Sequence, residues 1–414
     1  MRARVSLGGP TTGTGRLSGL PAVFLVAAVA AVAQAFGRFS FGVLLPAIRN
    51  DLGLSNTVGG SLGTANVAAY LIGTLTVASI SGRIRLLAIM RTGMILAVSG
   101  LGLAAVAPGP RTLAAALFLA GFGGAFSWIP APVVAAGALA PERRPLALGI
   151  LASGMGAGVV LSGQIAGYVR SDLGDTGWRT VYGILATIGT VVICAAFLLL
   201  SHQQAELSTR SGFGGFNILR RMPGWLPVTV AYTAFGLMYL LVIAFLATKL
   251  EDDNQWTGER ASLAFTVMGV AMVFGGPIFI ALAQRIGPRR ALILAFSGWI
   301  VATLVLIPAV PAPTFAAAGA SGLLFSAMPT LFTLYVVTNT TASDYGPSFA
   351  AATFAFGVAQ MVSPQLGGFL ADLAGSFTPV FLLSVGLAVV GLLAVLRIPS
   401  PSHHPRTPPG TGAG

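Results

Sequence analysis

The stretch PAVFLVAAVAAVAQAFGRFSFGVLLPAI, residues 21–48, decides the fold. It is apolar and carries a single charged residue, Arg38, well inside its length. A helix rises about 1.5 Å per residue, so this stretch exceeds the roughly 20 residues that a bilayer crossing needs. A guanidinium at that depth costs several kcal/mol unless it faces protein, water or an anion. We therefore predict a membrane-spanning helix whose arginine faces the inside of a bundle.

The whole chain has the composition of an integral membrane protein. Of its 414 residues, 55% are hydrophobic and 8% are charged, and the mean hydropathy is +0.86. Soluble globular proteins lie far from these values. The net charge of +12 does not indicate a nucleic-acid partner, because the arginines are scattered over short polar segments rather than gathered on one face. The partner that the composition predicts is the lipid bilayer.

Long apolar stretches recur along the chain, and their length and uniform hydrophobicity predict an all-α membrane protein. We predict twelve membrane-spanning helices in two six-helix halves, over residues 21–48, 57–80, 86–107, 113–140, 146–169, 178–200, 225–248, 262–283, 291–309, 314–338, 347–371 and 377–396.

An internal repeat divides the chain into two halves. The run Phe126-Ser127-Trp128-Ile129-Pro130 returns as Phe325-Ser326-Ala327-Met328-Pro329, and Asp172-Leu173 returns as Asp372-Leu373 at nearly the same offset. A duplication of this kind is typical of carriers that work by alternating access. The predicted order is a cytoplasmic tail, a six-helix bundle, a cytoplasmic loop, a second six-helix bundle and a disordered cytoplasmic tail, over residues 1–20, 21–200, 201–224, 225–396 and 397–414.

The arginines also predict the orientation. Most of them fall in the tails, the central loop and the alternate turns that share a side with the tails, among them Arg143, Arg220 and Arg289. Cytoplasmic segments of membrane proteins carry such an excess. We therefore expect a multi-pass protein of the inner (plasma) membrane with both termini in the cytoplasm, and we expect a monomer.

Arg38 is the leading candidate for a substrate-binding residue. It could attract an anionic substrate into a central cavity, or it could hold helices together through backbone carbonyls. Gln34 lies one turn earlier on the same face and could share a ligand. Its alternative role is an ordinary hydrogen bond between helices.

Further polar and aromatic residues could line the same cavity. Asn66 and Tyr70 form an i, i+4 pair, and Tyr232 and Tyr239 lie seven residues apart on one helix face. Trp128, next to two prolines, indicates a broken helix and a gate. Each of these side chains could instead serve packing or helix contact. Three further glutamines are expected to be structural: Gln164, Gln360 and Gln365.

Residues suited to acid–base chemistry are scarce in the apolar stretches. The three histidines lie in the central loop and the C-terminal tail, and the acidic residues fall at or beyond the ends of the apolar stretches. A membrane enzyme, which needs titratable groups at its reacting atoms, is therefore the weaker rival. A channel is disfavoured by the duplicated halves. We predict no catalytic, cofactor-binding or metal-binding residues.

Short motifs resemble one branch of a known family. The runs Gly37-Arg38-Phe39, Leu44-Leu45-Pro46, Asp51-Leu52-Gly53-Leu54-Ser55 and residues 65–73 (ANVAAYLIG) are similar to the YbfB/YjiJ-type branch of the major facilitator superfamily (MFS). The resemblance implies an inner-membrane secondary transporter. The turn QRIGPRR, residues 284–290, resembles the superfamily's basic turn motif but has glutamine in place of the usual aspartate.

The function expected from these observations is secondary active or facilitative transport of a small molecule, which the buried positive charge predicts to be anionic. The alternative is an efflux carrier for apolar or drug-like compounds.

Overall fold

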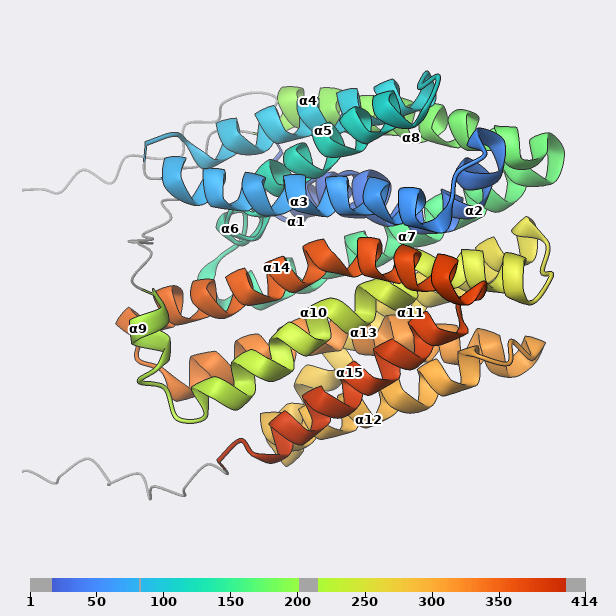
Figure 1. Ribbon diagram of the computed structural model, residues 1–414. Coiled ribbons are helices and arrows are strands. Elements are labelled where there is room, and N and C mark those ends of the chain that lie inside the picture. Colours follow the sequence, from blue (N-terminus) through green and yellow to red (C-terminus); the bar gives the residue numbers. More distant parts are fainter. Residues whose placement is uncertain (1–16, 82, 201–214, 400–414) are drawn as a thin grey trace, which may run out of the picture.

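The computed structural model describes residues 17–81, 83–200 and 215–399. Its regular structure there is helical, apart from one isolated bridge between Leu17 and Leu200. The predicted tails and central loop fall mostly outside these described residues. Figure 1 shows long helices lying side by side in two layers.

The N-terminal half comprises helices α1 to α8 of the described chain. Their bounds are α1 Leu20–Ala30, η1 Ala31–Phe39, α2 Ser40–Leu52, α3 Asn56–Ile80, α4 Leu86–Ala105, α5 Pro110–Trp128, α6 Ala131–Gly137, η2 Pro141–Arg143, α7 Arg144–Leu173, η3 Gly174–Gly177 and α8 Trp178–Leu199. Helix α1, the π-helix η1 and α2 form one continuous crossing, which holds the stretch that decides the fold.

The C-terminal half comprises α10 to α15. Their bounds are α10 Trp225–Thr248, η4 Lys249–Asp253, α11 Gly258–Ile286, α12 Pro288–Leu306, α13 Pro311–Asn339, α14 Ala342–Ala374 and α15 Thr378–Leu396. The short helix α9, Gly215–Leu219, lies in the predicted central loop. Each predicted span overlaps one long helical segment, except that the fourth covers both α5 and α6, and the bounds agree to within five residues.

Ten helical stretches of the described chain are long and apolar enough to cross a membrane. One of them, Arg144–Leu199, contains both α7 and α8, and the 33-residue α14 adds a further long helix. Large apolar side chains are exposed on the outside of the bundle, for example Phe24, Tyr168 and Leu198 at 60%, 74% and 74%. Exposed apolar surface on this scale suits contact with lipid.

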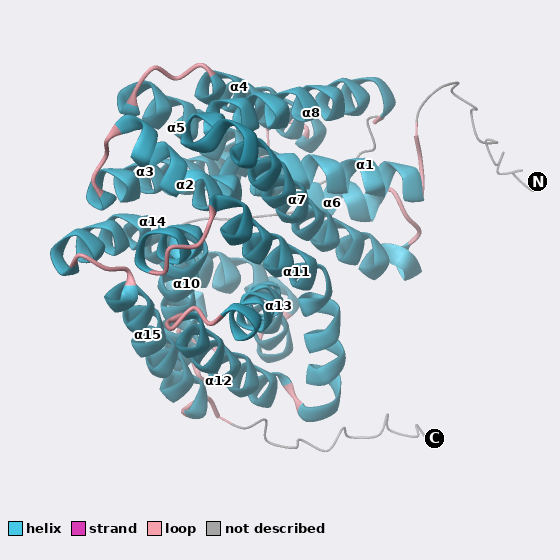
Figure 2. Ribbon diagram, turned by 90° about the vertical axis from the view of Figure 1, so that its right-hand side faces the viewer, coloured by secondary structure: helices cyan, strands magenta, loops and turns pink. Residues whose placement is uncertain are grey.

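The two halves lie one above the other in Figure 1 and pack mainly through three helix pairs, α2 with α10, α3 with α14 and α7 with α11. The described chain begins and ends on one side of the bundle, which also carries α9; we name this side the termini end. Figure 2 shows the same two groups from a perpendicular view. The turns at Gly53, Gly174 and Gly375, all with positive φ, lie at the opposite end.

Glycines allow the halves to approach closely. A Cβ built on Gly60 of α3 would lie 2.2 Å from the carbonyl oxygen of Pro364 in α14. A Cβ on Gly368 of α14 would likewise lie 2.1 Å from the carbonyl oxygen of Asn56 in α3. Small residues allow such backbone contact between membrane helices. The α3–α14 contact is therefore reciprocal, with one glycine contributed by each half.

Candidate functional site

Arg38 lies where the two halves meet, in the π-helix η1. Its Nη2 donates to Oε1 of Gln360 at 2.6 Å and to the hydroxyl of Tyr239 at 3.3 Å. Both partners belong to the C-terminal half, in α14 and α10. The arginine therefore bridges the halves at the level of the apolar core. π-Helical segments are often found at functional sites because they shift side chains out of the regular α-helical register.

Two residues of the N-terminal half complete the surroundings of Arg38. The Arg38 guanidinium carbon lies 4.7 Å from the centroid of the Tyr70 ring, within cation–π range. Gln34 donates from Nε2 to the Tyr70 hydroxyl at 3.3 Å. Gln34 and Arg38, which were predicted to lie on one helix face, thus both contact Tyr70.

These residues form one connected group, which we name the Arg38 cluster: Gln34, Arg38, Tyr70, Tyr239 and Gln360. Gln360 Nε2 closes it by donating to the Tyr239 hydroxyl at 2.6 Å. Gln34, Tyr239 and Gln360 are buried, whereas Arg38 and Tyr70 remain partly exposed. Within the described part of the chain, Arg38 forms no ion pair with a carboxylate. The cluster is therefore a partly accessible, uncompensated positive charge.

Asn66 holds the segment that carries Arg38. Its Nδ2 donates to the carbonyl oxygen of Gly37 at 2.9 Å and to that of Leu117 in α5 at 2.7 Å. Asn66 is 2% exposed, and Gly121 of α5 approaches its backbone so closely that a Cβ would lie 2.1 Å from the Asn66 carbonyl oxygen. Of its two predicted roles, helix contact is the one that these hydrogen bonds represent.

Trp128 and Tyr232 lie outside the Arg38 cluster. Trp128 is the last residue of α5, and the break before α6 agrees with the predicted broken helix. It packs on an apolar cluster that includes Val23 and Leu200, near the termini end. Tyr232 stacks on Phe356, with ring centroids 4.4 Å apart.

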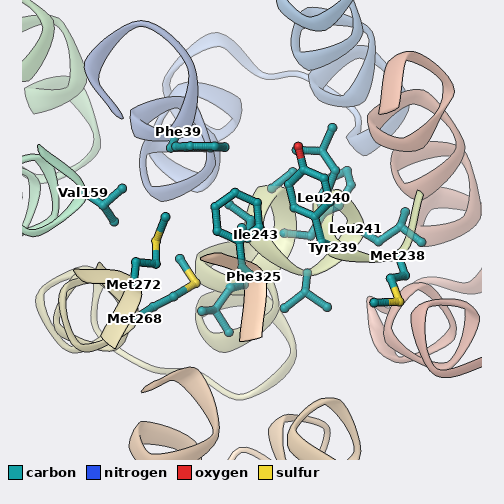
Figure 3. Close-up of a cluster of buried hydrophobic side chains, with 14 of the residues drawn as sticks. Phe39, Val159, Met238, Tyr239, Leu240, Leu241, Ile243, Met268, Met272 and Phe325 are labelled. Atoms are coloured by element: carbon teal, nitrogen blue, oxygen red, sulfur yellow. The ribbon is translucent and has the colours of Figure 1, made fainter. Parts of the chain in front are cut away.

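Aromatic and apolar side chains surround the cluster. Tyr239 and Phe325 have ring centroids 4.8 Å apart, and Phe325 meets Phe39 of the other half edge-on at 5.6 Å. Figure 3 shows these three rings near one another, with Met268 and Met272 beside them. The polar cluster is thus embedded in an apolar layer shared by both halves.

Sequence reasoning did not place Gln360 beside Arg38. It was expected to be structural, together with Gln164 and Gln365. The other two do form helix contacts, Gln164 with Thr266 at 3.1 Å and Gln365 with Ser61 at 2.7 Å, and both contacts join the halves. Gln360 differs because its amide oxygen accepts a hydrogen bond from Arg38. The 322 residues between the partners leave no local signal in the sequence.

Charged residues join the halves at the opposite end. Arg170 of α7 binds Glu251 through two hydrogen bonds of 2.8 and 2.6 Å, and Arg49 pairs with Asp252 at 2.5 Å. Asp372 of α14 accepts hydrogen bonds from the first two backbone amides of α3, at 2.9 and 2.7 Å. Carboxylates are favoured at helix N-termini, where the backbone amides lack partners. The opposite end is therefore closed by ionic contacts as well as by glycines.

Long apolar helices in two packed halves, with a charged group between them, define a multi-pass membrane transporter of the MFS fold. The chain belongs to the family described as "Uncharacterised MFS-type transporter YbfB", which matches residues 30–396. The predicted resemblance and fold class are confirmed. Members of this family are transporters, and the chain is accordingly assigned as a transporter and not as an enzyme.

Two curated relatives support the membership. The "Probable actinorhodin transporter" of Streptomyces coelicolor is 29% identical over 305 residues, covering 64% of this chain. The chain spans 50% of that relative's length. The "Uncharacterized MFS-type transporter YceJ" of Bacillus subtilis is 22% identical over 365 residues, covering 86% of this chain and 85% of that protein.

Solved structures share the fold at low sequence identity. A bacterial homologue of the human lysosomal transporter Spinster, inward-facing and unoccupied, matches with a TM-score of 0.75 and 16% identity, covering 92% of this chain and 98% of that one. A mutant of the nucleoside transporter NupG matches with a TM-score of 0.72 and 12% identity, covering 91% and 99%. At such identities the likeness concerns the fold alone.

Proposed function

We propose that this transporter moves a small anionic molecule across the inner membrane by alternating access, with Arg38 as the binding charge. The observation that carries the proposal is the Arg38 cluster, a partly exposed guanidinium between the halves without a carboxylate partner in the described chain. Arginine binds carboxylate and phosphate groups through paired hydrogen bonds. Burial in an apolar layer strengthens such contacts.

In this proposal the two six-helix halves, residues 21–200 and 225–396, rock about the cluster. The ionic contacts and glycine contacts at the opposite end close one entrance, and they must separate for the other state to form. The arginine bias supports cytoplasmic termini. With that orientation the closed entrance faces the outside of the cell.

The proposed energy coupling does not use an intramembrane carboxylate. Asp51 accepts hydrogen bonds from Arg179 and from the Trp178 indole, and Asp372 caps α3, so both acids already hold helix ends together. Proton relays in carriers are commonly Asp, Glu or His within the membrane. We therefore infer facilitated movement of the anion, exchange of one anion for another, or a proton carried on the substrate itself.

An efflux carrier for apolar or drug-like compounds is the second candidate. Stacked rings next to Arg38 favour it: Tyr232, Phe235, Tyr239 and Phe356 form successive contacts along α10 and α14. One relative is described as a probable actinorhodin transporter. The two candidates differ in whether the substrate needs a negative charge.

Thermal unfolding of the purified protein with matched ligands distinguishes them. Acetate and benzoate are compared with acetamide and benzamide, and phosphate is added as an inorganic anion. A ligand that binds the folded state raises its stability by mass action, about 2.7 kcal/mol at a hundredfold excess over Kd. We expect stabilisation by an anion, not by its amide, and none in Arg38→Ala. Equal stabilisation by a neutral analogue would instead favour the second candidate.

A further inference from the structure

We propose that Gln360 is a built-in occupant of the anion site, and that a substrate must displace it from Arg38 to break the bond between the halves. This inference rests on the proposed function, because it assigns Arg38 to the anion. It makes Gln360 a positioning residue that couples substrate binding to movement of the halves.

The geometry places an oxygen of Gln360 where an anion oxygen would bind. Its Oε1 lies 2.6 Å from Arg38 Nη2, within the range of charge-assisted hydrogen bonds. Gln360 is 3% exposed and comes from the opposite half. A carboxylate or phosphate oxygen would seek the same donor, so the amide and the substrate compete for one position.

Arg38 fixes which end of the Gln360 amide faces it, and Tyr239 binds the other end. A guanidinium has donors only, so Gln360 must present its oxygen to Arg38. Its Nε2 then donates to the Tyr239 hydroxyl at 2.6 Å, and the same hydroxyl accepts from Arg38 at 3.3 Å. The three side chains close a ring of hydrogen bonds that spans α14, α10 and η1.

Arg38 also keeps donors that Gln360 does not use. Both of its described hydrogen bonds leave from Nη2, while Nε is buried without a partner. A neutral amide offers one oxygen, whereas a carboxylate or phosphate offers at least two and a full negative charge. An anion can therefore outcompete Gln360, and its arrival releases the C-terminal half from Arg38.

Replacing Gln360 by glutamate tests the inference without a ligand. The new carboxylate would be a tethered anion of nearly unchanged size, paired permanently with Arg38 across the halves. Gln164→Glu is the matched control, because Gln164 also joins the halves but its recorded partner is Thr266. Because Gln164 is exposed and its partner is uncharged, a carboxylate there gains no buried ion pair. Only the substitution at Gln360 should therefore stabilise the protein.

The opening of the closed end can be followed at Ser262. This residue lies in α11 against Gly163 and Gly167 of α7 and is 1% exposed, so a cysteine there reacts only when the halves separate. The probe is Ser262→Cys in a Cys194→Ser background, which removes the exposed native thiol. Labelling uses a polar maleimide on the purified full-length protein.

We expect Gln360→Glu to raise the midpoint of thermal unfolding by about 2 °C or more and to slow labelling at Ser262→Cys about tenfold. Gln360→Leu should accelerate labelling, because it removes the bridge. Both effects of the glutamate should vanish when Arg38→Met is added. Gln164→Glu should not raise the unfolding midpoint, because it forms no such ion pair.

The inference is overturned if Gln360→Glu does not raise the unfolding midpoint above that of Gln164→Glu, or if labelling is unchanged by both Gln360 variants. Failure of the proposed function looks different. If the proposed function is wrong, anions would still stabilise Arg38→Ala against thermal unfolding, whether or not the Gln360 variants behave as expected. Loss of that stabilisation together with neutral Gln360 variants would retain Arg38 as the anion site and reject Gln360 as its occupant.

Discussion

At the scale of single residues, the aromatic ring of Tyr70 supports the charge of Arg38. The ring lies under the guanidinium, whereas the Tyr70 hydroxyl has only a long hydrogen bond from Gln34. Cation–π contacts contribute about 0.5–1 kcal/mol at exposed sites and about 2 kcal/mol when desolvated, and the partly exposed Arg38 lies between these cases. We therefore propose that the ring, rather than the hydroxyl, is the part of Tyr70 that supports binding.

Two substitutions of Tyr70 separate these contributions. Tyr70→Phe keeps the ring and should transport at near the wild-type rate. Tyr70→Leu removes the ring and should reduce substrate affinity by about 3-fold to 30-fold. The measurement is concentration-dependent uptake into proteoliposomes by both variants. Equal losses in the two variants would show that the hydroxyl is the important group.

The sequence predicted part of this site. Arg38 was identifiable because a charge inside an apolar stretch is costly, and Gln34 followed from helical spacing. Tyr70 and Tyr239 were candidates on helix faces, but nothing local in the sequence distinguishes Tyr239, which reaches Arg38, from Tyr232, which stacks on Phe356. Gln360 required the packing of α14 against the other half.

At the scale of helices, the π-helix η1 could not be predicted from hydrophobic periodicity. The carbonyl of Gly37 is bound by the Asn66 side chain, and that of Phe36 accepts from the Ser40 hydroxyl at 2.6 Å. Both side chains bind backbone carbonyls of the segment whose helix geometry departs from the α-helix. The Asn66 contact comes from another helix, so the pattern of apolar residues along the segment does not record it.

The contact between α3 and α14 depends on glycine at Gly60. In Gly60→Ala the new methyl group would overlap the Pro364 carbonyl, whereas Gly102 of α4 has no atoms within 4 Å of the same position. Overpacking of this kind costs about 1–3 kcal/mol. Gly60→Ala should accelerate labelling at Ser262→Cys about fivefold or more, and Gly102→Ala should leave the rate unchanged.

One outcome would contradict the prediction for Gly60→Ala. If Gly60→Ala and Gly102→Ala label at the same rate, the α3–α14 contact does not hold the opposite end closed. An unfolding midpoint for each variant serves as the control for general destabilisation.

At the scale of the whole molecule, the twelve predicted spans coincide with the long helices of the described chain because length and uniform hydrophobicity are strong signals. The helix ends were less predictable, since polar contacts such as Asp253 with the backbone of Phe377 extend helices beyond the apolar stretch. The way in which the halves pack needed the structure, because it rests on glycine–backbone approaches far apart in sequence.

The orientation of the bundle in the membrane can be tested at its two ends. Asp172, exposed at the end of α7, and Asn217, exposed in α9, lie at the opposite end and the termini end. In a Cys194→Ser background, Asp172→Cys should react with an impermeant thiol reagent in intact cells. Asn217→Cys should react only after permeabilisation, because arginine-rich segments remain in the cytoplasm. The reverse pattern would invert the proposed orientation.

The central claim is that Arg38 supplies the charge that binds a transported anion. Its most direct test is counterflow in liposomes, without a pH gradient, of the anion that stabilises the wild-type protein. The account predicts exchange by the wild type and loss of at least about tenfold to a hundredfold in Arg38→Ala. Arg38→Lys should recover only part of the rate, because lysine keeps the charge but not the planar fork. Wild-type exchange by well-folded Arg38→Ala would contradict the account.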